Sequence, residues 1–396
     1  MTDNLTEIRR RRTWLRAADC DIEAFARQQS RTTEATDYPL AGEIAGNVPV
    51  YDGDAIRAAA AEPEARQALL AEWSEAMLNG PGIVAFRDTF TDLAVIDAAT
   101  ARFDEMIVAE REAGQVAADH FAKAGANDRV WNALQKLCLR DPGLFAAYYG
   151  NEAIALVSRA WLGPAWQVTS QVNCVNPGGA AQSAHRDYHL GFQSSSEIER
   201  YPAHVHRLSP LLTLQGAVAH CDMPPESGPT LYLPYSQSYE PGYLATGRPE
   251  FRAYFEAHHV QLQLRKGDAV FFNPALFHAA GHNRSRDIRR MANLLQVSSA
   301  FGRAMEAVDR TRMSRALFPV LVSLRAEGRL SETQAANAIA ACAEGYAFPT
   351  NLDRDPPIGG LAPESQAGLM LRALAQGWEP DAFDKAIDRQ ARNRLT

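Results

Sequence analysis

Between residues 166 and 298 the sequence is a succession of short segments, rich in Val, Thr and Gln, in which side-chain character changes every second residue. Gly, Pro and Ser separate these segments, as is typical of turns between strands. Successive side chains of a strand point to opposite faces, so each segment predicts a strand with one buried face. The expected strands are 166–175, 211–220, 230–234, 260–264, 269–273 and 291–298. Many short strands joined by turns predict an all-β sandwich or jelly roll.

Helical periodicity flanks this β-rich region on both sides. The segments 55–79, 92–113 and 130–162 precede it, with a short buried strand expected at 83–86. The segments 304–327, 332–344 and 364–393 follow it. We therefore expect three parts, namely an N-terminal helical arm over 1–80, a mainly β core over 81–300 and a C-terminal helical extension over 301–396.

Composition excludes several classes of protein. Hydrophobic residues make up 46% of the 396 residues, which allows a large buried core. A net charge of −7 gives no electrostatic reason to bind nucleic acid or an anionic membrane. The 5 cysteines are scattered and form no C-x-x-C pair, which argues against a disulfide framework or a zinc ribbon. With no apolar run of about 20 residues and no signal-peptide pattern at the start, we expect a cytoplasmic protein.

The segment Ala184-His185-Arg186-Asp187 is the first candidate for chemistry. If it forms a strand, His185 and Asp187 lie on the same face and Arg186 points away from them. An imidazole and a carboxylate on one face can bind one metal ion. The pattern is short and occurs by chance, so a surface or core role for either residue stays open without a third ligand.

A second group of residues supplies that third ligand. A tight turn at Lys266-Gly267-Asp268 leads into an apolar, aromatic strand, and His278 follows. Two histidines and one carboxylate form the facial triad of non-haem Fe(II) oxygenases, which leaves open positions on the metal. Arg289 comes 11 residues after His278 (289 − 278 = 11) and offers a guanidinium fork for the distal carboxylate of 2-oxoglutarate. His282 is the alternative third ligand, but the spacing to Arg289 favours His278.

These residues resemble the phytanoyl-CoA dioxygenase family of Fe(II)/2-oxoglutarate oxygenases over roughly residues 80 to 300. The resemblance includes the H-x-D motif, the Gly267-Asp268 turn with its aromatic strand, and His278 followed by Asn283, Ser285 and Arg289 in the family's order. The stretch 222–236 also resembles the family's E-x-G-P … P-x-S-H turn, with Gln237 where the family has a histidine that is not a ligand.

The resemblance implies a double-stranded β-helix, that is, a cupin-like jelly roll, for the β core. It implies His185, Asp187 and His278 as ligands of Fe(II), and Arg289 as the anchor of 2-oxoglutarate. In relatives the strand before the H-x-D motif also touches the co-substrate. Gln171 and Asn173 occupy similar positions here, although both could equally be ordinary polar residues of a strand face. His120 falls in a region that helps to close the pocket in relatives, and a structural role for it stays open.

The predicted function is a dioxygenase that uses O2 to hydroxylate or otherwise oxidise a small organic substrate while 2-oxoglutarate becomes succinate and CO2. Halogenating relatives lack the carboxylate that Asp187 provides, so its presence favours hydroxylation. Two alternatives remain, namely a cupin-type metal enzyme that does not use 2-oxoglutarate and a binding protein on the same scaffold. The expected partner is a small molecule, with a homodimer possible and neither nucleic acid nor membrane expected.

Overall fold

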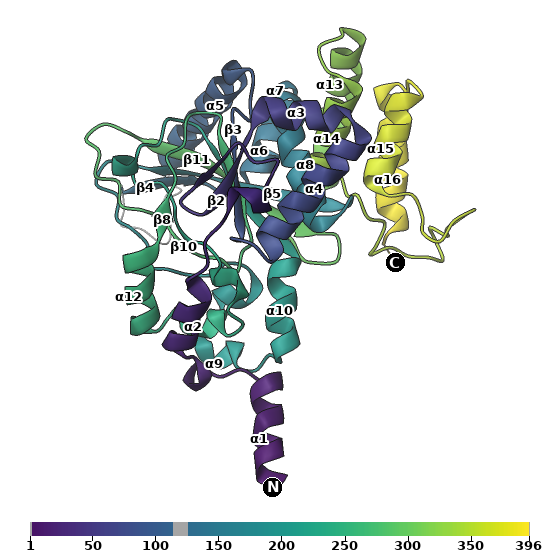
Figure 1. The fold of residues 1–396 in the computed structure, drawn as a ribbon. Coiled ribbons are helices and arrows are strands. Elements are labelled where there is room, and N and C mark those ends of the chain that lie inside the picture. The colour runs from purple at the N-terminus through teal and green to yellow at the C-terminus, as the bar shows by residue number, and fades with distance from the viewer. Residues whose placement is uncertain (1, 114–125, 396) are drawn as a thin grey trace. The chain divides into compact units, whose positions relative to one another are not determined.

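The computed structural model describes residues 2–113 and 126–395 (Figure 1). The chain divides into two compact units, the first made of residues 1–89, 118–129 and 173–294 and the second of residues 90–117, 130–172 and 295–396. His120 lies outside the described residues. No helix in the described part of the chain is long and apolar enough to cross a membrane. The predicted three-part division of the chain stays a prediction.

The strands form an eight-stranded sheet in the order β1-β2-β3-β9-β6-β11-β5-β4 and a three-stranded sheet in the order β10-β7-β8. Their bounds are β1 (Glu43–Ala45), β2 (Val48–Asp52), β3 (Ile83–Arg87), β4 (Asn127–Val130), β5 (Trp166–Val175), β6 (Thr213–Ala219), β7 (Leu231–Leu233), β8 (Val260–Gln261), β9 (Ala269–Phe272), β10 (Phe277–Ala279) and β11 (Arg290–Ser299). The large sheet is mixed, because β2 and β3 run parallel while β3, β9 and β6 alternate in direction. A mixed sheet of this size with flanking helices fits a jelly-roll core. The expected strands are present, but β1, β2, β4 and β10 were not predicted.

The helices of the first unit are α1 (Thr2–Thr13), α2 (Ile22–Gln29), α3 (Gly53–Ala61), α4 (Pro63–Leu78), α9 (Ser195–Ile198), α10 (Ala203–Leu211), α11 (Gly242–Ala245) and α12 (Pro249–His258). The helix predicted over 55–79 is in fact two helices. Glu62 is extended (φ −107°, ψ 121°) because it precedes Pro63, whose ring disfavours helical geometry at the residue before it.

The second unit is mostly helical. Its helices are α5 (Leu93–Glu112), α6 (Ala133–Arg140), α7 (Pro142–Tyr149), α8 (Glu152–Leu162), α13 (Arg310–Ala326), α14 (Glu332–Cys342), α15 (Gln366–Ala375) and α16 (Pro380–Asn393). The break predicted at Asp141 is present, and its side chain caps α7 by accepting from the Leu144 N–H. Helix α13 packs against α6, α7, α14 and α16 and so forms the centre of this unit.

Strand β9 lies between β3 and β6 and is buried along its whole length. Phe271 pairs with Val84 on one side and with Gly216 on the other. A Cβ at Gly216 would lie 2.4 Å from the Phe271 ring, so only glycine fits there. The aromatic strand predicted after the Gly267-Asp268 turn is therefore a central strand of the first unit.

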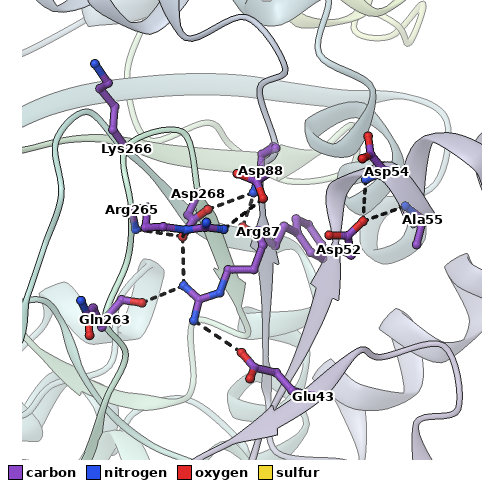
Figure 2. Close-up of polar contacts among 12 residues, drawn as sticks. Glu43, Asp52, Asp54, Ala55, Arg87, Asp88, Gln263, Arg265, Lys266 and Asp268 are labelled. Atoms are coloured by element: carbon purple, nitrogen blue, oxygen red, sulfur yellow. Dashed lines mark hydrogen bonds and ion pairs between the residues drawn. The ribbon is translucent and has the colours of Figure 1, made fainter.

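An ion pair between buried Asp268 and partly exposed Arg87 fixes the start of β9 against the end of β3 (Figure 2). The Asp268 side chain is fully buried and accepts from Arg87 Nη1 at 2.9 Å and from the Asp88 N–H at 2.9 Å. The Arg265 N–H also donates to it, at 2.8 Å. Gly267 has φ +90°, a conformation that favours glycine, so the turn needs both residues of the Gly-Asp pair.

An aromatic cluster supports β10 from the side of α2. The ring of Phe25 stacks on Phe277 with centroids 5.2 Å apart, and it also contacts Tyr239 and Phe251 at 5.1 Å each. Phe277 is fully buried. Rings of this size contribute much of the hydrophobic stabilisation of a core. The cluster therefore stabilises the position of β10 and of His278, which follows Phe277.

Candidate metal centre

Two histidines far apart in the sequence face each other in an isolated antiparallel bridge. The His185 N–H donates to the His278 carbonyl at 3.0 Å, and the His278 N–H donates to the His185 carbonyl at 3.2 Å. The Asp187 N–H donates to the Pro274 carbonyl at 3.2 Å and extends the pairing. The H-x-D segment was expected on a regular strand, but it forms only this bridge beside β10. The bridge still brings His185, Asp187 and His278 together.

The side chains of these three residues converge. One potential ligand atom from each residue lies within 4.8 Å of the others. His185 Nε2 is 3.7 Å from Asp187 Oδ1, and His278 Nε2 is 3.3 Å from Asp187 Oδ2. His278 is buried, while His185 and Asp187 are partly buried. The three ligand atoms are close enough together to bind a single metal ion.

Backbone contacts orient both imidazoles for metal binding. His185 Nδ1 lies 2.9 Å from the Ser183 carbonyl, and His278 Nδ1 lies 2.9 Å from the Leu276 carbonyl. A carbonyl can only accept, so each Nδ1 carries the proton in these contacts and each Nε2 keeps its lone pair. This is how metal-ligating histidines are commonly held by their surroundings. Burial and the neighbouring His278 lower the pKa of His185, which favours its neutral, ligating form.

A side chain of β6 contacts the carboxylate of Asp187. Gln215 on β6 donates its Nε2–H to Asp187 Oδ2. Burial alone would raise the pKa of Asp187, but the hydrogen bond that Gln215 donates helps to hold it below its ordinary value. A negative carboxylate is the ligand form. The sequence analysis did not single out Gln215, because a glutamine at an inward position of a strand carries no motif.

The two adjacent arginines after His278 differ in burial. Arg289, the predicted anchor, is exposed, whereas Arg290 begins β11 and is 7% exposed. Burial lowers the pKa of Arg290 to about 10, so it stays charged at neutral pH. Its Nη1 donates to the Gly281 carbonyl at 3.5 Å, and none of the ion pairs found among the described residues involves it. A buried guanidinium without a carboxylate partner is costly unless a ligand supplies one.

Tyr232 lies close enough to Arg290 for the two groups to shift each other's pKa. Tyr232 is also the cross-strand partner of His278 in the β7–β10 pair. Directly paired residues project their side chains to the same face of a sheet. The ring of Phe272 contacts both, with centroids 5.2 Å from Tyr232 and 4.8 Å from His278. Arg290 therefore lies near a residue that shares a sheet face with His278.

The other predicted residues are placed as follows. His282 is exposed and is not part of the cluster found among the described residues. Asn173 is partly buried on β5, and its Oδ1 has no hydrogen-bond partner in the described chain. Gln171 belongs to the second unit, where its Nε2 donates to Gln296 Oε1 at 3.4 Å. Contact of Gln171 and Asn173 with a co-substrate stays a prediction.

Two imidazole nitrogens and one carboxylate on one side of a metal are the donor set of non-haem iron oxygenases. The sequence from residue 65 to residue 291 matches the family described as phytanoyl-CoA dioxygenase (PhyH). Because this match covers more than half of the chain, the chain belongs to the phytanoyl-CoA dioxygenase family and is an oxygenase-type enzyme.

Individual relatives are more distant. Dioxygenase trt7 from Aspergillus terreus is 30% identical over 132 residues, which are 33% of this chain and 41% of that protein, so the match spans less than half of the relative. Among solved structures, the non-heme alpha ketoglutarate dependent epimerase SnoN from nogalamycin biosynthesis is 19% identical over 60% of this chain and 82% of its own, with a TM-score of 0.40. The carbocyclase SnoK from the same biosynthesis is 21% identical over 57% of this chain and 83% of its own, with a TM-score of 0.42. Similarities this low do not assign a reaction.

Proposed function

We propose that the protein is a non-haem Fe(II)- and 2-oxoglutarate-dependent dioxygenase that hydroxylates or otherwise oxidises a small organic molecule. One observation carries the proposal, namely the convergence of His185, Asp187 and His278 within 4.8 Å in a member of the phytanoyl-CoA dioxygenase family. We also infer that the two sheets belong to a double-stranded β-helix, the fold that the sequence resemblance implies.

The residues fit a divalent iron ion. Each histidine directs an unprotonated Nε2 towards the carboxylate, because each Nδ1 donates to a backbone carbonyl. A set of two nitrogens and one oxygen leaves open positions for further ligands, as the non-haem oxygenases require. When bound, Fe(II) together with 2-oxoglutarate and O2 would supply the oxidising chemistry, with succinate and CO2 as the co-products.

We propose Arg290, in place of its neighbour Arg289, as the anchor of the distal carboxylate of 2-oxoglutarate. Arg290 is the buried member of the pair, and its guanidinium has no carboxylate partner among the described ion pairs. A guanidinium can bind a carboxylate bidentately, and burial strengthens this attraction. A cupin-type enzyme that does not use 2-oxoglutarate has no need for such a buried cation.

The remaining residues orient and shield the site. Phe272 and Tyr232 cover one side of His278 with aromatic surface, which excludes water from that side. Asp187 would provide the carboxylate ligand whose absence would leave room for a halide, so we expect hydroxylation-type chemistry and no halogenation.

The test is a turnover experiment under 18O2 with a panel of small organic substrates. We expect one labelled oxygen in succinate, coupled to a product that gains oxygen or loses two hydrogens. Substrate turnover that proceeds without O2 or without 2-oxoglutarate would refute the proposal. Binding of Fe(II) and 2-oxoglutarate can be measured separately, so the site can be tested before the substrate is known.

A further inference from the structure

We infer that Gln215 is a positioning residue that holds the carboxylate of Asp187 for iron binding, and that the fold itself does not require a glutamine there. Gln215 lies in the middle of β6, where it pairs with Phe272 of β9. Its Nε2–H donates to Asp187 Oδ2. The inference rests on the proposed iron site, and it adds a residue that neither the H-x-D motif nor the third histidine reveals.

The amide of Gln215 is only half satisfied. Its Oε1 is buried and has no hydrogen-bond partner in the described part of the chain. Buried polar atoms are nearly always paired, and one that is left unpaired is destabilising. An apolar side chain of similar size, such as methionine, would avoid this unpaired oxygen. The bond to Asp187 is therefore the feature that accounts for a glutamine at this position.

The hydrogen bond from Gln215 fixes the orientation of the Asp187 carboxylate. The Asp187 backbone is already fixed, because its N–H donates to the Pro274 carbonyl at 3.2 Å and its own carbonyl accepts from Tyr243 Oη at 3.4 Å. The side chain could still rotate about its terminal torsion, which is broad for aspartate. The amide of Gln215 removes this freedom by holding Oδ2. Fixing the direction of a ligand in this way raises metal affinity.

The chain contains a matched control. Gln237 is also buried, its Nε2 donates to the Gly80 carbonyl at 2.8 Å, and its Oε1 is also without a partner among the described residues. Gln237 differs from Gln215 in one respect that matters here, because its partner is a backbone carbonyl and not a candidate iron ligand. A methionine at either position removes one hydrogen bond and one unpaired oxygen.

The experiment compares Gln215→Met and Gln237→Met with the wild-type protein, using Fe(II) as the probe in anaerobic competition against a chelating dye. We expect Gln215→Met to bind Fe(II) about 10- to 100-fold more weakly, the usual effect of losing a partner of a metal ligand. Gln237→Met should bind Fe(II) like the wild type. The melting temperature of metal-free Gln215→Met should change by less than about 2 °C, because the lost bond and the removed unpaired oxygen offset each other.

Two outcomes would overturn the inference. Wild-type Fe(II) affinity in Gln215→Met would show that the amide does not position the carboxylate. A weakened affinity accompanied by a large drop in the melting temperature would show a structural role, and Gln215→Leu repeats the comparison if the methionine variant does not fold. If the wild-type protein itself fails to bind Fe(II), the proposed function fails instead, so the two failures are distinguishable.

Discussion

His185 and His278 are 93 positions apart in the sequence (278 − 185 = 93), yet they are directly opposite residues of a backbone bridge with ring centroids 4.5 Å apart. Each backbone N–H donates to the carbonyl of the other residue. Backbone pairing therefore places the two imidazoles next to each other. Asp187 is placed by the same pairing through its bond to Pro274.

The first prediction concerns the iron ligands. Asp187→Ala and His278→Ala should each lose most of their Fe(II) affinity, because each change removes one of three protein ligands. Metal content after anaerobic reconstitution is the measurement. His282→Ala is the control and should retain iron, since His282 is exposed and lies outside the cluster. Wild-type iron content in either ligand variant would mean that the assignment is wrong.

The second prediction separates the two adjacent arginines. Arg290→Ala should weaken 2-oxoglutarate binding by on the order of 2–5 kcal/mol, the usual cost of removing one partner from a buried charge pair. That is at least about a 30-fold loss. Arg289→Ala is the matched control and should bind nearly as well as the wild type, because Arg289 is exposed. Arg290→Lys should recover only part of the loss.

The measurement is an anaerobic titration of 2-oxoglutarate into the Fe(II)-loaded protein, followed by the charge-transfer absorption of the complex. If Arg289→Ala loses affinity and Arg290→Ala does not, the anchor is the residue predicted from sequence spacing. If neither variant loses affinity, 2-oxoglutarate is not held by this part of the chain.

The sequence was informative where a local pattern determines structure. Alternating side chains predicted β5, β6, β9 and β11, and the Asp141-Pro142 break between α6 and α7 was placed correctly. Strands β1 and β2 were not predicted, because they are strands only through pairing. Strand β1 pairs with β2, and β2 pairs with β3. Short segments such as these have no periodicity of their own, so only tertiary contacts identify them.

The candidate site shows the same limit. The order and spacing of the motifs predicted that His185, Asp187 and His278 form one site. The three side chains converge in the structure. Spacing placed the anchor at Arg289, and that stays a prediction, because a one-residue change of register exchanges the inward and outward faces of a strand. Gln215 was missed because its role depends on which strand lies beside Asp187, and that is a property of the sheet order.

The third prediction concerns Asp268, the buried member of the ion pair that precedes β9 (Figure 2). Asp268→Ala should destabilise the fold by about 2–4 kcal/mol, because it removes the charge-assisted hydrogen bonds from Arg87 and from two backbone N–H groups. Asp54→Ala is the control, since Asp54 pairs with Arg57 on the surface and is 90% exposed. Surface pairs contribute at most about 1 kcal/mol. Chemical denaturation measures the free energy of unfolding of both variants, and equal losses would contradict the assigned role of Asp268.

The fourth prediction concerns Arg186, the residue between the two ligands of the H-x-D motif. Its guanidinium is buried and donates to the carbonyls of Ser236 at 2.6 Å and Tyr239 at 2.9 Å. It also lies over the Phe277 ring, with its Cζ 5.1 Å from the centroid. Since Arg186 points away from the metal centre and into the core, its position constrains the backbone on which His185 and Asp187 are mounted.

Gly242 provides a way to test this constraint, because a Cβ at that position would lie 1.9 Å from Arg186 Cζ. Gly242→Ala should therefore displace the guanidinium, destabilise the fold and weaken Fe(II) binding at a site that Gly242 does not touch. Arg186→Met should also destabilise the fold, but it removes the atoms that the new methyl group would meet. In the double variant the cost of Gly242→Ala should fall by about 0.5–3 kcal/mol, the range of coupling between residues in contact. Denaturation of all four proteins measures this coupling, and strictly additive effects would show that the packing of Gly242 against Arg186 does not matter to the fold.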